Sequence, residues 1–134
     1  MKTLSITQPY AELIKNGTKK IETRSWKTNY RGTIYIHASS TNIPKTSKEN
    51  IELMRLTANA DMDFGRVICS AELVDCIEMT KSYIENLKTT NYNEFVSGIY
   101  EKGRYAWILE NVRVLDEPIK AKGNLGLWNL ELPQ

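Results

Sequence analysis

Residues 17–26 combine residue types and a spacing that point to chemistry. Gly17 ends a short helical pattern, and Lys19 follows it at the turn. Glu22, Arg24 and Trp26 then alternate along a predicted strand, so their side chains should share one face of it. Charged side chains are rarely buried unless they are paired. The pattern therefore predicts a polar site with an aromatic wall.

Each of these side chains has a chemical role that it could fill. Arg24 could hold a phosphate or a carboxylate through two parallel hydrogen bonds, and Lys19 could add a point charge to the same anion. Glu22 could accept from the exocyclic amine of a base, or act as a general acid or base. Trp26 could stack on a base, which is worth about 1–3 kcal/mol. The spacing alone leaves a solvated strand face equally open, because exposed ion pairs contribute only about 0–1 kcal/mol each.

Other candidate ligand-binding residues lie outside this run. Trp107 and Trp128, the two remaining tryptophans, also fall on predicted strands, and Trp128 is the one we assign to core packing. Tyr10 and Gln8 lie where the first strand meets a helix, and Gln8 could read a base edge or only cap that helix. His37, the single histidine, alternates away from the core-facing residues of its strand and could be a ligand contact or a structural residue.

Composition excludes several classes of protein. The 134 residues predict one domain, residues 1–134, and a net charge of +2 is too small for strong nonspecific binding to polyanions. One histidine and two cysteines fit no metal-ligand spacing, so we expect no metal ion. There is no phosphate-binding loop or dinucleotide fingerprint, and we expect no cofactor. Without a membrane-spanning run or a signal peptide, we expect a cytoplasmic protein that does not bind membranes, and we favour a monomer.

Periodicity and turn residues predict about six strands and three or four helices. Strands are expected over residues 3–7, 21–26, 33–38, 66–79 (bent or bulged midway), 105–115 (ended by Pro118) and 126–132. Helices are expected over residues 9–16, 51–56 (after a capping box at 46–49) and 81–88 (capped by Thr80), with a further short turn capped near Asn91. Residues 39–47 should form a loop. This pattern predicts an α+β fold built on a small closed or nearly closed β-barrel.

The run from Gly17 to Arg24 resembles the Gly-x-Lys-x-x-Glu-x-Arg signature of the ASCH domain (activating signal cointegrator homology), with Gly17, Lys19, Glu22 and Arg24 at the matching positions. Residues 4–11, 30–39, 105–110 and 126–128 resemble further segments of this family, in the same order. The resemblance spans residues 4–130 and implies a small PUA-like (ASCH) β-barrel of about six strands with short helices at its edges.

The resemblance also implies a function class. PUA-like domains are associated with RNA and modified bases, so we expect binding of RNA or a modified nucleotide or nucleoside in a polar and aromatic cleft around the motif. The alternative is a small hydrolase of acylated nucleosides, similar to the N4-acetylcytidine amidohydrolases of the family. Those relatives are thought to use a threonine where this chain has Glu22, and Thr23 should point to the opposite face. The catalytic residues would then be Glu22, activating water, and Lys19, stabilising the oxyanion. A ribonuclease would pair Glu22 with Lys19 or His37.

Overall fold

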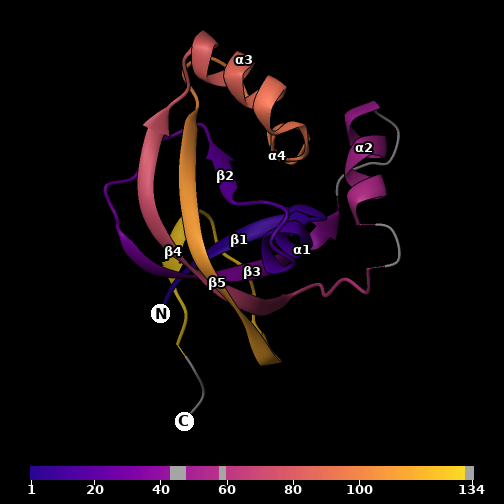
Figure 1. Ribbon diagram of the computed structural model, residues 1–134. Helices are drawn as coiled ribbons and strands as arrows, with labels where there is room; N and C mark the ends of the chain where they lie inside the picture. The colour runs from indigo at the N-terminus through magenta and orange to yellow at the C-terminus, as the bar shows by residue number, and fades with distance from the viewer. Residues whose placement is uncertain (43–47, 58–59, 132–134) are drawn as a thin grey trace.

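Six strands and four helices make up the described part of the chain. The computed structural model describes residues 1–42, 48–57 and 60–131. The elements in chain order are β1 (Lys2–Gln8), α1 (Tyr10–Lys15), β2 (Ile21–Arg24), β3 (Gly32–Asn42), α2 (Lys48–Leu56), β4 (Arg66–Glu78), α3 (Lys81–Thr90), α4 (Tyr92–Val96), β5 (Tyr105–Lys120) and β6 (Leu127–Asn129). Figure 1 shows α1 beside the strongly curved strands, α3 and α4 together at one end of β4 and β5, and α2 at the side.

All six strands join one sheet, in the order β2–β5–β4–β3–β1–β6. Neighbouring strands are antiparallel except β1 and β3, which run parallel. The end strands β2 and β6 do not pair with each other, so the barrel stays open at a seam. Across this seam, the Arg24 side chain on β2 donates to the Ser5 carbonyl on β1 at 3.0 Å. The predicted α+β fold of about six strands with short helices is confirmed, but backbone hydrogen bonds do not close the barrel.

β4 and β5 are long strands bent by irregular pairing. The register shifts three times between them, so the expectation of a bulge within residues 66–79 is confirmed. The expectation that Pro118 ends β5 is wrong, since the strand continues to Lys120. The pairing passes from Val67↔Ile119 to Cys69↔Val114. Residues 115–118 therefore form a bulge. Pro118, which has no backbone N–H, fits there because the bulged residues do not need to donate to the neighbouring strand.

Two other strand predictions need correction. β3 extends to Asn42, although a loop was expected from Ser39, because a bulge in β1 lets Gln8 pair with Asn42. β2 ends at Arg24, so Trp26 follows the strand and does not lie on it. The capping box expected at 46–49 begins outside the described residues.

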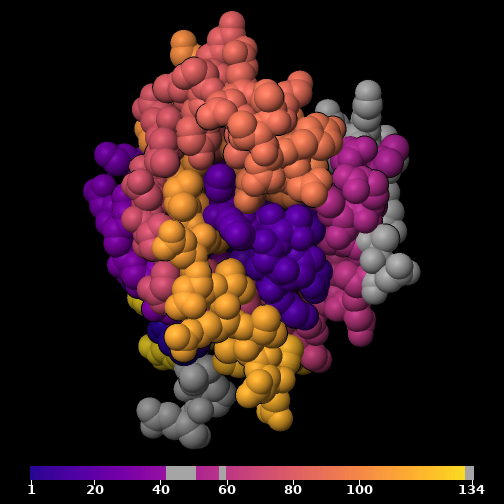
Figure 2. Space-filling model, in the orientation of Figure 1, coloured from indigo at the N-terminus to yellow at the C-terminus, as the bar shows by residue number. Residues whose placement is uncertain are grey.

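The core lies between the inner face of the sheet and α1, and it includes the expected Ile34, Ile36 and Ala38. Burying each isoleucine side chain stabilises the fold by about 1.5–3 kcal/mol. In Figure 2 the segment around α1 fills the space between α4, α2 and β5. At the ends of the helices, Thr80 accepts from Tyr83 N at 3.1 Å and Asn91 from Glu94 N at 3.3 Å, which confirms both predicted caps. None of the described helices is long and apolar enough to cross a membrane.

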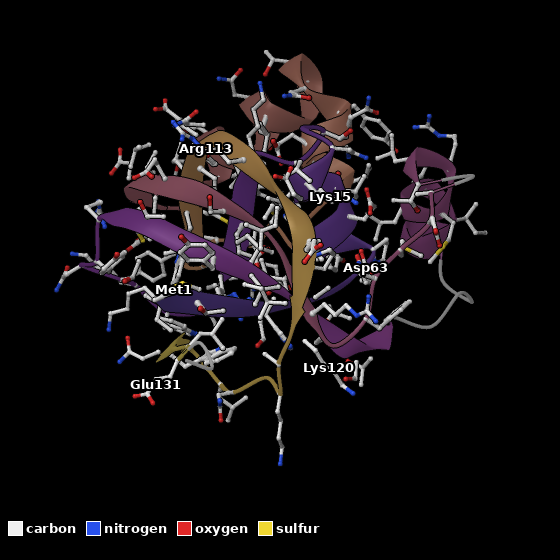
Figure 3. The ribbon with its side chains drawn as sticks, turned by 90° about the horizontal axis from the view of Figure 1, so that it is seen from below. Met1, Lys15, Asp63, Arg113, Lys120 and Glu131 are labelled. Atoms are coloured by element: carbon white, nitrogen blue, oxygen red, sulfur yellow. The ribbon has the colours of Figure 1, made fainter. Side chains whose placement is uncertain are left out.

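The segment after β5 folds over the outer side of β1 and β3. His37 is only 1% exposed there, because its ring is covered by this segment. Its Nε2 lies 2.8 Å from the Ala121 carbonyl and its Nδ1 lies 3.0 Å from Ser5 Oγ, which also accepts from Trp128 Nε1 at 3.1 Å. Since a carbonyl only accepts, Nε2 carries a proton, and in the neutral ring Nδ1 accepts from Ser5. Met1 and Glu131 lie on the same side of the molecule in Figure 3, consistent with the bond from the Met1 amino group to the Leu130 carbonyl.

This packing makes Gly123 a sensitive position. A Cβ added there would lie 2.8 Å from Ser5 Oγ and 2.9 Å from His37 Cε1. We expect Gly123→Ala to lower the free energy of unfolding by about 1–3 kcal/mol, as overpacking does in a tight site. Urea unfolding would measure the change. Asn124→Ala, an exposed position in the same loop, is the control and should change stability by less than about 0.5 kcal/mol. Equal stability of Gly123→Ala and the wild type would contradict this role for Gly123.

Candidate binding pocket

A pocket of about 300 Å³ occupies the open seam, between β2 and the part of β1 that follows its pairing with β6. Its walls come from three parts of the chain: Ser5, Ile6, Thr7 and Tyr10 from β1 and α1; residues 22–26 from β2 and its end; and Gly98, Ile99 and Arg104 from the segment between α4 and β5. The volume is at the lower end of the range for ligand pockets. The pocket exists because β2 pairs only with β5 and leaves its other edge free.

Glu22 and Arg24 form an ion pair in the pocket wall. Glu22 Oε2 accepts from Arg24 Nε at 3.0 Å and from Arg24 Nη2 at 2.7 Å. The same Nη2 group reaches the Ser5 carbonyl. The pairing confirms that alternation brings these two side chains together. It also balances the charge of Arg24 and occupies its Nε and Nη2 donors, which leaves only Nη1 of the donors that were expected to hold an anion.

Lys19 lies beneath the pocket and does not line it. The residue is 0% exposed, and Nζ donates to the carbonyls of Ile21 and Ser97 and lies 3.5 Å from Glu22 Oε1. Three acceptors match the three donors of an ammonium group. Burial lowers the pKa of Lys19, and the charges of Glu22 and Glu94 oppose that effect. A direct contact between Lys19 and a ligand, as expected from the motif, is not available in this arrangement.

Glu94, which sequence reasoning missed as a site residue, supports the turn from the other side. Its carboxylate accepts from the backbone N of Lys20 at 2.7 Å and of Ile21 at 3.3 Å. Burial raises the pKa of Glu94, and Lys19 opposes this. The sequence signalled only a short capped turn after Asn91. That pattern predicts a helical turn, but it does not show that Glu94 contacts the backbone at Lys20 and Ile21.

Two of the aromatic candidates, Trp26 and Tyr10, line the pocket, and the third, Trp107, packs behind Trp26. Trp26 lines the pocket with 39% of its surface exposed, as a stacking residue requires. Trp107 is fully buried behind it, with ring centroids 4.7 Å apart and planes at 88°, and its Nε1 donates to the Trp26 carbonyl at 3.3 Å. Tyr10 lines the pocket, and its ring centroid is 5.3 Å from Lys19 Nζ. Trp107 therefore positions Trp26 and does not itself face the pocket.

Gln8 and His37 lie outside the pocket. Gln8 is fully buried, where Oε1 accepts from Glu12 N at 2.8 Å and Nε2 donates to the Asp63 carbonyl at 2.8 Å. Of the two roles predicted for Gln8, reading a base edge or capping the helix, these bonds correspond to capping. His37 instead borders a second hollow with Ser39 and Lys122, and it does not line the pocket that contains Glu22.

The wall opposite β2 contains two features that the sequence did not reveal. Gly98 packs so tightly that an added Cβ would lie 2.9 Å from Thr23 Cγ2. Thr23 Oγ1 accepts from Ile99 N at 3.0 Å, so Thr23 also lines the pocket although it was expected on the opposite face. Arg104 precedes β5 and donates from Nε to the Ile99 carbonyl at 3.0 Å.

The described residues contain no group of three or more His, Cys, Asp or Glu side chains that could hold a metal ion.

The buried position of Lys19 predicts a structural role. Lys19→Met removes the charge and leaves the carbonyls of Ile21 and Ser97 without a donor. We expect a loss of about 3 kcal/mol in the free energy of unfolding, the lower end of the range for a broken buried pair, because Glu22 keeps Arg24. Urea unfolding would measure it, with Lys20→Met, the exposed neighbour, as a control expected within about 0.5 kcal/mol of the wild type. If both variants are equally stable, Lys19 does not hold the segments together.

Comparison with known proteins agrees with this fold. Activating signal cointegrator 1 of Homo sapiens is 28% identical over 131 residues, which is 96% of this chain and 22% of that protein, and the Mus musculus protein of the same name matches equally. This chain thus spans about a fifth of the length of these curated relatives. Two crystal structures, of ASCH from Zymomonas mobilis and of its tyrosine-to-phenylalanine mutant, align with TM-scores of 0.55 and 0.52. Both are 17% identical, covering 89% of this chain and 72% and 74% of theirs.

At 17% identity these structures show the fold alone. The family model described as the ASCH domain matches residues 4–119, which is most of the chain. The protein therefore belongs to the ASCH domain family.

Proposed function

We propose that the pocket between β1 and β2 binds a single unstacked base of RNA, or of a modified nucleotide or nucleoside. The observation that carries the proposal is the half-exposed Trp26 ring in a polar pocket beside Glu22. Tryptophan offers a flat surface for stacking, and a carboxylate accepts from the exocyclic amine of a base. Proteins recognise single-stranded RNA and flipped-out bases with this combination of groups.

The size and surroundings of the pocket favour one base over a duplex. The volume of about 300 Å³ suits a small ligand that enters the seam. Trp107 packs behind Trp26 and bonds its carbonyl, so the stacking surface is held before the ligand arrives. Less ordering on binding leaves more of the interaction energy for affinity.

A hydrolase of acylated nucleosides is the second candidate. The observation that favours it is the 3.5 Å contact between Glu22, which lines the pocket, and Lys19, whose pKa is lowered by burial. A carboxylate and an amine of lowered pKa are a suitable pair for proton transfer. The Lys19 ammonium already satisfies two carbonyls and Glu22, and this makes binding without turnover the function that we favour.

Trp26→Ala tests the stacking surface. We expect the affinity for the bound nucleoside or RNA to fall by about 5- to 150-fold, the equivalent of about 1–3 kcal/mol. Isothermal titration calorimetry would measure it without relying on tryptophan fluorescence. Tyr92→Ala, an exposed aromatic residue on α4 outside the pocket, is the control and should keep its affinity. No binding of the wild type to varied RNA, single-stranded DNA and nucleosides at low salt would contradict the proposed function.

Glu22→Gln separates binding from catalysis. The amide still accepts and donates hydrogen bonds, so a binding protein should keep much of its affinity. A hydrolase that needs Glu22 for proton transfer should lose on the order of 10²–10⁴ in rate. Mass spectrometry of a nucleoside panel that includes N4-acetylcytidine would measure turnover. Thermal unfolding of the variant must accompany this, since Glu22 contacts both Lys19 and Arg24. Turnover by the wild type that Glu22→Gln abolishes, at unchanged stability, would establish the hydrolase.

A further inference from the structure

The pocket is lined by two arginines that differ in what balances their charge. Arg24 is paired with Glu22 at 2.7 Å. Arg104 forms no ion pair with any carboxylate in the described part of the chain, and its two hydrogen bonds go to neutral backbone carbonyls. Arg104 therefore supplies a positive charge to the pocket that no acidic side chain neutralises.

Those two carbonyls hold the guanidinium group of Arg104 in place. Nε donates to Ile99 O at 3.0 Å on one wall, and Nη2 approaches Thr23 O on β2 at 3.4 Å. A guanidinium group has five N–H donors in a rigid planar fork. Two are used by the carbonyls, which leaves three for a ligand. A cationic side chain that is already held in position loses little conformational entropy when it binds an anion.

We propose that Arg104 binds a phosphate group of the ligand, so that the pocket takes a phosphorylated nucleotide unit in preference to a bare nucleoside. This inference rests on the proposed function, in which the base stacks on Trp26. Glu22 would meet the amine-bearing edge of the base, while Arg104, from the wall formed by residues 98–104, would meet the phosphate. A planar fork matches phosphate oxygens through two parallel hydrogen bonds. The motif arginine, Arg24, then orients Glu22 and does not carry the anion.

The proposal makes a prediction for the unmodified protein. Calorimetry should show that a nucleoside monophosphate binds at least about tenfold more tightly than the same nucleoside, as a charge-assisted contact would give. The preference should shrink between 50 mM and 500 mM KCl, because phosphate contacts are screened by salt and base stacking is not. A 5′-monophosphate, a 3′-monophosphate and a dinucleotide form the panel. A preference for a monoester indicates a free nucleotide, and one for the diester indicates an RNA strand; either supports the phosphate contact.

Three variants separate phosphate binding from a purely structural role of Arg104. Arg104→Ala should lose the preference, so that the monophosphate binds only as tightly as the nucleoside. Arg104→Lys keeps the charge without the planar fork and should retain part of the preference. Arg113→Ala, on β5 outside the pocket, removes an exposed arginine and should keep the full preference for the monophosphate (Figure 3). Thermal unfolding of each variant checks that it is folded.

The failure of this inference is distinguishable from that of the proposed function. Equal affinity of the wild type for nucleoside and monophosphate overturns the role of Arg104 and leaves base binding intact. An equal loss of both affinities in Arg104→Ala also overturns it, since Arg104 would then only hold Ile99 and the pocket wall. Binding of neither ligand by the wild type removes the proposed function itself.

Discussion

The buried ammonium group of Lys19 is the interaction on which the rest of the pocket depends. It joins the turn after α1 and the start of β2 at Ile21 to the end of α4 at Ser97, which lies 78 positions further along the chain than Lys19. Burying an unpaired charge would be prohibitive, so Glu22 and the two carbonyls must lie where they do. Glu94 supports the same turn through backbone N–H groups, and so the wall of residues 97–99 is held against β2.

The motif charges are therefore used mainly within the protein. Lys19 is enclosed, and Arg24 is divided between Glu22 and the Ser5 carbonyl across the open seam. This arrangement keeps β1 and β2 apart at a set spacing without a backbone ladder, and the gap that results is the pocket. The groups left to meet a ligand are the exposed ring of Trp26 and Arg104, whose charge is not balanced by a carboxylate. Glu22 also lines the pocket, but it is only 6% exposed and both of its carboxylate oxygens accept hydrogen bonds within the protein.

Local patterns predicted most of the elements, and the errors have physical causes. The alternation of Ile34, Ile36 and Ala38 and the caps at Thr80 and Asn91 depend on neighbours in sequence, and these predictions were confirmed. Pro118 did not end β5, because it lies in a bulge, where no backbone N–H is needed for pairing with β4. His37 was correctly placed away from the core-facing residues, yet it is buried, because the segment that covers it comes from residues 121–128.

For the site, the sequence by itself determined the residue types of β2 and the shared face of Glu22 and Arg24 through alternation. Only the tertiary structure decided which charges are available. Whether a cation is free depends on acceptors supplied by other segments, such as Ser97 for Lys19 and Ser5 for Arg24, and no local spacing encodes them. Arg104 enters the pocket because β5 pairs with β2, a contact between residues about 80 positions apart that forms only when the sheet is assembled.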